Sequence, residues 1–346
     1  MTSNPLPLNI SRFGGCTLTG ALSVTTQVRD TVTIVHGPKG CTHHNFSLLH
    51  ATGLDNDRVT LPDLISTGLV ESDIIFGGEG ALERTLDAVA KRNIGAIFVL
   101  STCIVDSIGD DVAAVCRRNR GVPVLPVPSG GFLGGTFQNG MNNALNAIAD
   151  TAEPCQKGWC VNIIGEKNLE YEVEENCAEV TRLLTALGIS VNLRFLRDCS
   201  MIDITRLGAA RLNILRDDDL RTVGERLHQR FATPFISSFP VGLAGTNDFL
   251  ESVADSFGVK NLRAVREEKV LQEEILTEFN DITGTSITFD PALTDSDTFK
   301  IACEVADRID ITIDRDGCRV PLEISPPVGT AGVRRMLHRW RRAIHA

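Results

Sequence analysis

Three of the ten cysteines in this sequence of 346 residues occur in glycine-rich or polar segments. Cys16 follows two glycines, Cys41 ends the segment His-Gly-Pro-Lys-Gly-Cys, and Cys103 ends the segment Ser-Thr-Cys. Thiolates are the usual ligands of iron–sulfur clusters, and glycine lets the backbone approach a bulky inorganic group. The alternative is that each cysteine is a small, buried apolar residue. These two interpretations depend on where the fold places the three segments.

Short apolar runs alternate with amphipathic segments, which is typical of parallel sheets covered by helices on both faces. The first series predicts buried strands at residues 31–36, 72–76, 96–102 and 122–127 and helices at residues 80–92, 110–119 and 141–149. The second series predicts a helix through residues 181–187 and strands at residues 159–164, 190–195, 211–215 and 234–238. The pattern therefore predicts an α/β protein with two doubly wound, Rossmann-like parallel-sheet domains.

We expect three regions along the chain. Residues 1–152 form a Rossmann-like domain that carries the three cysteines, and residues 153–247 form a second such domain. Residues 248–346 form a short mixed C-terminal region with helices at 248–258 and 263–280, short strands at 286–290 and 309–314, and a final basic helix at 332–346.

If the strands at residues 31–36 and 96–102 are neighbours, their ends place chemistry at one edge of the first sheet. In parallel α/β sheets, ligands bind at the carboxyl ends of the strands. Cys41 and Cys103 follow two different expected strands, and Cys16, on a glycine-rich turn before a helix, can fold onto the same edge. A glycine-rich turn at residues 77–80 is expected there as well, after the strand at residues 72–76.

Composition excludes several classes of function. The net charge of −10 and the aromatic content of 5% argue against a nucleic-acid-binding surface over the whole protein. No apolar run is long enough to span a membrane, and the first ten residues lack the features of a signal peptide. We therefore expect a cytoplasmic protein with reduced cysteines. No phosphate-binding G-x4-GK[ST] segment occurs, so ATP hydrolysis would require another subunit.

The segments around the three cysteines resemble the nitrogenase component 1 superfamily. That superfamily contains nitrogenase molybdenum–iron protein subunits, cofactor scaffolds, protochlorophyllide reductase subunits and methanogen homologues. The resemblance covers most of residues 10–255 and depends on residues 14–16, 36–41, 72–78, 101–111, 206–215 and 240–250. It implies that Cys16, Cys41 and Cys103 ligate an iron–sulfur cluster at a subunit interface. The residues expected around that cluster are Gly15, His36, Lys39, Gly40 and His43.

The ligand count indicates what kind of partner is needed. One chain offers three thiolates, whereas a 4Fe-4S cubane normally takes four ligands. Two similar subunits would supply six thiolates, enough for an 8Fe-type cluster. We therefore expect a homodimer, or a heterodimer or heterotetramer with a paralogous component 1 subunit. The resemblance also implies an ATP-hydrolysing iron protein as electron donor.

Two departures from the family pattern bear on the substrate. The expected strand at residues 211–215 runs into Arg-Asp-Asp-Asp, where the nitrogen-reducing members supply a cysteine, and no clear third Rossmann-like domain follows. We therefore expect a catalytic component of a nitrogenase-like, ATP-dependent reductase that acts on a flat organic substrate, with a tetrapyrrole as the leading candidate. The alternatives are a non-catalytic scaffold for assembly of a nitrogenase-type metallocofactor and an electron-transfer or regulatory module.

The remaining cysteines and the basic helix have simpler interpretations. Cys199 follows a strand of the second domain and is a candidate thiol of the substrate site. Cys155 and Cys160 form a single C-x4-C pair, and the other four cysteines are expected to be packing or incidental residues. The final helix has no acidic residue, so we expect a solvated or intersubunit helix, or one that binds a phosphate or an acidic partner. Its arginines are Arg334, Arg335, Arg339, Arg341 and Arg342.

Overall fold

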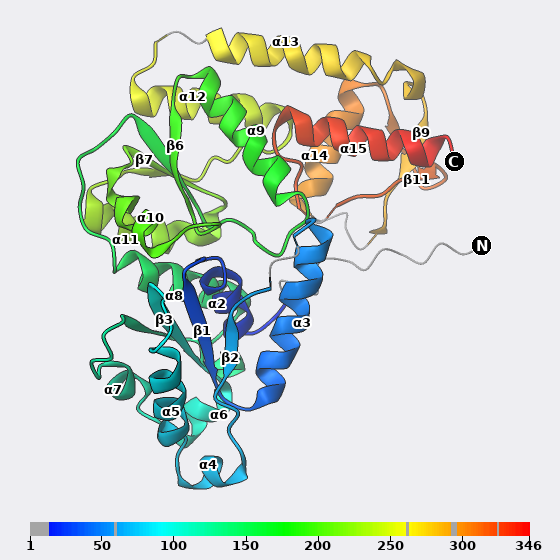
Figure 1. Cartoon of the computed structure of the whole chain (residues 1–346). Helices are drawn as coiled ribbons and strands as arrows, with labels where there is room; N and C mark the ends of the chain where they lie inside the picture. The colour runs from blue at the N-terminus through cyan, green and yellow to red at the C-terminus, as the bar shows by residue number, and fades with distance from the viewer. Residues whose placement is uncertain (1–13, 59–60, 261–262, 292–295, 324) are drawn as a thin grey trace. The chain divides into compact units, whose positions relative to one another are not determined.

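The computed structural model describes residues 14–58, 61–260, 263–291, 296–323 and 325–346 (Figure 1). The chain divides into two compact units. The larger, which we call the cysteine unit, comprises the described residues up to Val173 together with Val191–Ser237. The smaller, which we call the C-terminal unit, comprises Glu174–Ser190 and Ser238–Ala346.

The first sheet of the cysteine unit is parallel and has the strand order β2-β1-β3-β4. Its strands are β1 (Thr31–His36), β2 (Leu64–Ser66), β3 (Ala96–Ser101) and β4 (Val124–Val127). The helices around it are α2 (Thr17–Thr25), α3 (Lys39–Asp55), α4 (Glu71–Phe76), α5 (Glu79–Val89), α6 (Cys103–Ile108), α7 (Val112–Cys116) and α8 (Phe137–Ala149).

Both faces of the first sheet are buried, as the continuous apolar runs predict. On β1, Val32 and Ile34 belong to a buried cluster with residues of α5 and α7, among them Leu86 of α5. Val35 points to the opposite face and joins the cluster formed with α2 and α8, which includes Leu22. The alternation of side chains along a strand thus places one helical layer on each face.

The second sheet of the cysteine unit has the strand order β6-β5-β7-β8, and β7 pairs in parallel with both β5 and β8. Its strands are β5 (Cys160–Ile164), β6 (Ser190–Phe195), β7 (Leu212–Leu215) and β8 (Phe235–Ile236), with helices α10 (Met201–Ile204) and α11 (Arg221–Phe231). Ile164, Leu215 and Leu227 share one buried cluster with α2 and α8. The cysteine unit therefore has a core that is continuous between its two sheets.

The close crossing of α2 and α8 depends on two glycines. A Cβ atom on Gly20 would lie 1.9 Å from the carbonyl oxygen of Phe137, and one on Gly140 would lie 1.9 Å from that of Thr17. No larger residue fits at either position without moving a backbone. This contact fixes the beginning of α2, which is the helix that follows Cys16.

The strand predicted at residues 72–76 is wrong. Those residues belong to helix α4, and the strand beside β1 is β2, which pairs through Leu64 and Ile65. The carboxylate of Asp73 accepts a hydrogen bond from the backbone N–H of Val70 and so stabilises the start of the helix. Phe76 is 86% exposed, so the apolar run is not buried. The turn at residues 77–80 consequently follows a helix and not a strand.

The C-terminal unit contains a small parallel sheet of order β10-β9-β11. Its strands are β9 (Ser286–Thr288), β10 (Thr312–Ile313) and β11 (Cys318–Arg319), and its helices are α12 (Gly242–Phe257), α13 (Arg263–Thr277), α14 (Asp297–Arg308) and α15 (Gly329–Ile344); α9 (Val173–Ala186) lies in it except for its first residue. The mixed α/β fold class is confirmed, whereas the region boundaries at residues 152 and 247 stay predictions.

Helix α15 is the basic helix expected at the end of the chain. Its Trp340 is fully buried and donates a hydrogen bond to the carbonyl oxygen of Pro321. Its arginines form ion pairs within the same unit: Arg334 with Glu278, Arg339 with Glu323, and Arg341 with Asp281. These carboxylates already neutralise much of the basic stripe, so the helix packs against its own chain and is not simply a solvated face.

Candidate metal centre

Two of the three predicted ligands follow neighbouring strands. β1 leads into α3, which has Cys41 in its first turn, and β3 leads into α6, which begins at Cys103. His36 and Ser101, the last residues of the two strands, are register partners. Because β1 and β3 are neighbours, Cys41 and Cys103 lie at the same edge of the first sheet.

Cys16 reaches this edge through the segment between β4 and α8. It is the N-cap residue of α2 and forms an isolated antiparallel bridge with Thr136. The hydroxyl of Thr17 donates to the carbonyl oxygens of Ser129, at 2.6 Å, and of Gly131. Gly131 has a φ of +54°, and a Cβ atom there would lie 3.4 Å from the Sγ of Cys103. One glycine-containing turn thus contacts both the start of α2 and the third cysteine.

The three thiols are close enough to interact electrostatically. All three cysteines are partly buried. Burial raises the pKa of the Cys41 thiol above its usual value, and the neighbouring Cys103 and Cys16 raise it further. Three thiolates would therefore repel one another in this place unless a cation were present. A bound metal reverses that preference, because coordination deprotonates a thiol.

Each cysteine also lies at the beginning of a helix. Cys16 caps α2, Cys41 lies in the first turn of α3, and Cys103 is the first residue of α6. The amino end of a helix carries partial positive charge on its unpaired N–H groups, which stabilises a nearby anion. A cluster ligated by thiolates is an anion of this kind, so the local backbone suits it.

The donor set fits an iron–sulfur cluster better than a single metal ion. Within the described ranges, no group of three or more His, Cys, Asp or Glu residues could hold one ion. A cluster has a different requirement, because each of its irons takes its own protein thiolate. Cys16, Cys41 and Cys103 would supply three such thiolates, and this role stays a prediction.

The residues expected around the cluster occupy different environments. Gly15 is partly buried beside Thr19, and Gly40 is exposed with open space where a side chain would be. Lys39 and His43 are exposed on the first turns of α3, on either side of Cys41 in the sequence. A role for these residues toward a cluster stays a prediction.

His36 is a buried structural residue. Its side chain is inaccessible to solvent, and its ring nitrogens lie 3.0 Å from the hydroxyl of Thr67 and 3.1 Å from the carboxylate of Asp110. Burial lowers the pKa of His36, and the hydrogen bond and charge of Asp110 oppose that effect. Asp110 also accepts from the backbone N–H of Gly78, whereas Asp111 caps α7 by accepting from the N–H of Ala114. Asp110 thus connects His36 to the turn at Gly78, whereas Asp111 stabilises the start of α7.

Cys199, the candidate substrate-site thiol, is buried at a parallel bridge with Val28. Its thiol donates to the carbonyl oxygens of Arg194, at 2.9 Å, and Arg197, at 3.2 Å, and burial raises its pKa to about 11. It is not among the described residues that line the cavity next to Cys16. A role for Cys199 in substrate binding stays a prediction.

A cavity of about 530 Å³ lies beside the cysteine edge, and we call it the central cavity. Gly14 and Gly15, directly before Cys16, form part of its wall. Other wall residues are supplied by α8 and by the segments that follow β4, β5 and β7, namely Phe132, Phe137, Gln138, Met141, Glu166, Lys167, Asp217 and Asp219. The cavity thus lies where the carboxyl ends of both sheets of the cysteine unit meet, which is the usual place for a ligand in α/β folds.

Charged side chains dominate one wall of the central cavity. The Nζ of Lys167 lies 3.0 Å from the carboxylate of Asp217, and Glu166 accepts a hydrogen bond from Arg194 at 3.0 Å. Among the described wall residues, none is a cysteine or a histidine. The only feature of this cavity wall that the sequence analysis foresaw is the lack of a cysteine after β7. For the other wall residues, the available signal was the position of Glu166 and Lys167 shortly after an expected strand.

The chain is similar to known proteins. Residues 16–285 match the family described as nitrogenase component 1 type oxidoreductase. The chain is 31% identical over 274 residues to the nitrogenase iron-molybdenum cofactor biosynthesis protein NifE of Nostoc sp., covering 75% of this chain and 55% of the relative. It is 32% identical over 266 residues to NifE of Clostridium pasteurianum, covering 75% of this chain and 57% of the relative.

Among solved structures, "Nitrogenase Cp1 at pH 5" superposes with a TM-score of 0.68 and 22% identity, covering 90% of this chain and 65% of that one. This match concerns the fold alone. The chain belongs to the nitrogenase component 1 type oxidoreductase family. Members of that family bind clusters of the iron–sulfur type. Across the described residues, no helix is both long and apolar enough to cross a membrane.

Proposed function

We propose that this chain holds an iron–sulfur cluster through Cys16, Cys41 and Cys103, and that it serves as a scaffold on which a nitrogenase-type metallocluster is assembled. The observation that carries the proposal is the central cavity, whose wall includes Gly14 and Gly15, directly before Cys16, and has no cysteine or histidine among its described residues. Permanent cluster sites use thiolate or imidazole ligands. A cluster without such ligands from these walls would be released more readily, as a scaffold requires.

The relatives support the scaffold alternative over the reductase. The two NifE proteins are named for cofactor biosynthesis and are matched over three quarters of this chain. The chain spans just over half the length of these curated relatives, so what the whole relatives do comes to this chain only as a proposal. The charged wall of the cavity also suits a tetrapyrrole poorly, since the apolar faces of a macrocycle would bury Lys167 and Asp217 away from water.

A partner subunit completes the proposed cluster site. Three thiolates leave one position of a four-iron cubane open, and a paralogous component 1 subunit would fill it or contribute a second set for an eight-iron cluster. In the same proposal an ATP-hydrolysing iron protein supplies electrons. The cluster would carry the electrons, whereas Cys16, Cys41 and Cys103 would hold it in place and the helix starts would stabilise its negative charge.

The test is a count of iron and sulfide after anaerobic purification, before and after mild chelation. A scaffold binds two pools of iron: one that resists the chelator and depends on Cys103, and one that the chelator removes and an acceptor protein takes up. Cys103→Ala should remove the resistant pool. Lys167→Met should reduce the labile pool and leave the resistant one, while Lys91→Met, at an exposed position, should change neither.

Two outcomes would overturn the proposal. If Cys103→Ala keeps the full iron content and the same electron paramagnetic resonance spectrum, the cluster assignment is wrong. If the wild type binds no labile iron, and its cluster is oxidised when a tetrapyrrole is added with iron protein and ATP, the protein is a reductase.

A further inference from the structure

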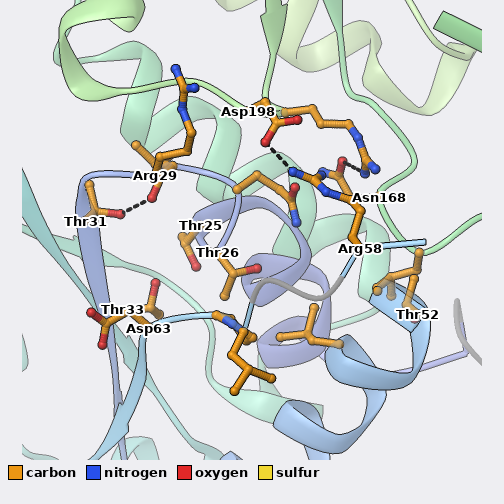
Figure 2. Close-up of a pocket in the computed structure, with 18 of the residues that line it drawn as sticks. Thr25, Thr26, Arg29, Thr31, Thr33, Thr52, Arg58, Asp63, Asn168 and Asp198 are labelled. Atoms are coloured by element: carbon orange, nitrogen blue, oxygen red, sulfur yellow. Dashed lines mark hydrogen bonds and ion pairs between the residues drawn. The ribbon is translucent and has the colours of Figure 1, made fainter. Parts of the chain in front are cut away.

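A second cavity lies at the opposite edge of the first sheet, and we call it the amino-edge cavity. Its volume is about 350 Å³. Thr31 begins β1 and Asp63 directly precedes β2, so the cavity lies where the strands start, whereas the cysteines lie where they end. The last turns of α2 and α3 and the segments after β5 and β6 complete the wall (Figure 2). All these segments belong to the cysteine unit.

The wall carries several hydroxyl groups, and one of them has no partner. Thr26, Thr31 and Thr52 donate to the carbonyl oxygens of Leu22, Val28 and Leu48, respectively, at 2.7–2.9 Å. Thr25, the last residue of α2, is 0% exposed, and its hydroxyl has no hydrogen-bond partner among the described residues. A buried hydroxyl without a partner is unfavourable, and native proteins usually pair such groups with protein, water or ligand.

Arginines outnumber carboxylates on the same wall. Arg29, Arg58 and Arg197 line the cavity, together with Asp63 and Asp198. Figure 2 shows Arg58, Asn168 and Asp198 grouped on one part of the wall, with Thr25 and Thr26 on another. Asp63 forms an ion pair with Arg92, and Arg29 forms one with Asp203 at 3.4 Å. Neither partner is a wall residue, so these two charges are compensated from outside the wall.

Arg58 retains donors for a ligand. It forms an ion pair with Asp198 through Nη2, and a guanidinium group has five N–H donors in a planar fork. That geometry matches the paired oxygens of a carboxylate or phosphate. Arg58 lies just beyond the end of α3, and its positive charge would attract an anion that enters the cavity.

A cation suits the cavity less well. The carboxyl ends of α2 and α3 meet here, and helix ends of this polarity favour positive charge. Their last carbonyl groups are already used: Leu22 accepts from the N–H of Thr26, and Gly53 accepts from the N–H of Arg58. The three guanidinium groups of the wall would repel a cation directly.

We propose that the amino-edge cavity binds a small molecule with an oxyanion group, a carboxylate or a phosphate, which accepts hydrogen bonds from Arg58 and from the hydroxyl of Thr25. The site is separate from the cysteines and from the central cavity, although Asn168 contributes to the walls of both cavities. The proposal does not depend on the proposed function.

Isothermal titration calorimetry on the full chain tests the proposal, with sodium phosphate and sodium malonate as probes and sodium chloride at equal ionic strength as the blank. We expect saturable binding of at least one probe. Binding of phosphate alone would indicate that the ligand is a phosphate ester, and binding of malonate alone would indicate a carboxylate. Binding of both would support an oxyanion site that accepts either group. Arg58→Gln should weaken binding about tenfold, because a charge-assisted hydrogen bond is lost.

Thr25→Val separates ligand binding from folding. Valine keeps the shape and removes the unpaired hydroxyl, so the melting temperature should stay the same or rise while affinity falls several-fold. Thr85→Val is the matched control, because that hydroxyl donates to the carbonyl oxygen of Ala81 within α5 and Thr85 is not a wall residue, and Arg118→Gln is the control for lost charge at an exposed position. Both controls should bind like the wild type. The proposal is wrong if neither probe binds above the chloride blank, or if Arg58→Gln and Thr25→Val bind as tightly as the wild type.

Discussion

Replacing Gly131 by alanine should displace Cys103, a proposed cluster ligand. The residue has a φ of +54°, a left-handed conformation that costs an L-residue about 1–2 kcal/mol. The added Cβ would also lie 3.0 Å from the backbone N and the Cβ of Cys103 and 3.4 Å from its Sγ. These contacts are tighter than normal packing allows, so Cys103 must move. The expected results are a melting temperature lowered by a few degrees and a clear loss of bound iron.

Gly109→Ala is the matched control for this prediction. Gly109 ends α6, the helix that Cys103 begins, and has a φ of +80°, but a Cβ there would have no neighbour within 4 Å. It should therefore carry the same conformational cost of about 1–2 kcal/mol without moving the thiol. Iron and sulfide per chain after anaerobic reconstitution, with thermal unfolding of the metal-free chain, separate the two effects. Full iron and an unchanged resonance spectrum in Gly131→Ala would refute the placement of Cys103 at a cluster.

Three further predictions concern stability and reactivity. Gly140→Ala should prevent stable folding, because its Cβ would lie 1.9 Å from the carbonyl oxygen of Thr17; soluble yield and circular dichroism check this, and a variant with the wild-type melting temperature would contradict it. Since burial holds the pKa of His36 below its unfolded value of 6.5, its contribution to stability is complete above pH 6.5 and is lost as the pH falls below that value. In His36→Asn the slope of unfolding free energy against pH below 6.5 should decrease by up to about 1.4 kcal/mol per pH unit, and an unchanged slope would exclude His36 as its source. Cys199, with its pKa raised to about 11, should resist alkylation at pH 8 in the folded chain and react after denaturation, as peptide mass mapping would show; rapid labelling of the native chain would refute the burial argument.

The sequence predicts the sheets more reliably than the short apolar segments. β1, β3 and β5 are continuous β-branched runs buried on both faces, and nothing local competes with that pattern. The run at residues 72–76 has the same composition but is exposed, and the side chain of Asp73 stabilises a helix instead. Local pattern alone does not distinguish the two cases, because burial depends on which segment lies beside β1.

The same limit applies to the sites. The cysteines were predictable because each follows a glycine or a strand end, and strand ends meet at one edge in this class of fold. The cavities were not predictable, because their walls combine residues that are distant in the sequence, such as Gln138 with Lys167 and Asp217. Such walls depend on how the two sheets pack, and no local pattern encodes that. The roles of Cys16, Cys41 and Cys103 stay predictions until iron is counted.

The placement of the three cysteines at the starts of three separate helices also bears on how the metal-free chain behaves. A cluster bound there would cross-link segments that are distant in the sequence, and it would reduce the conformational freedom of the unfolded chain much as a multiple disulfide does. The free energy of cluster binding would then contribute to the free energy of folding of the sheet edge that holds the cluster. Metal loss would first loosen the beginnings of α2, α3 and α6, while the buried strands between them keep their pairing. In such a chain, delivery of iron and sulfide is the last step of folding.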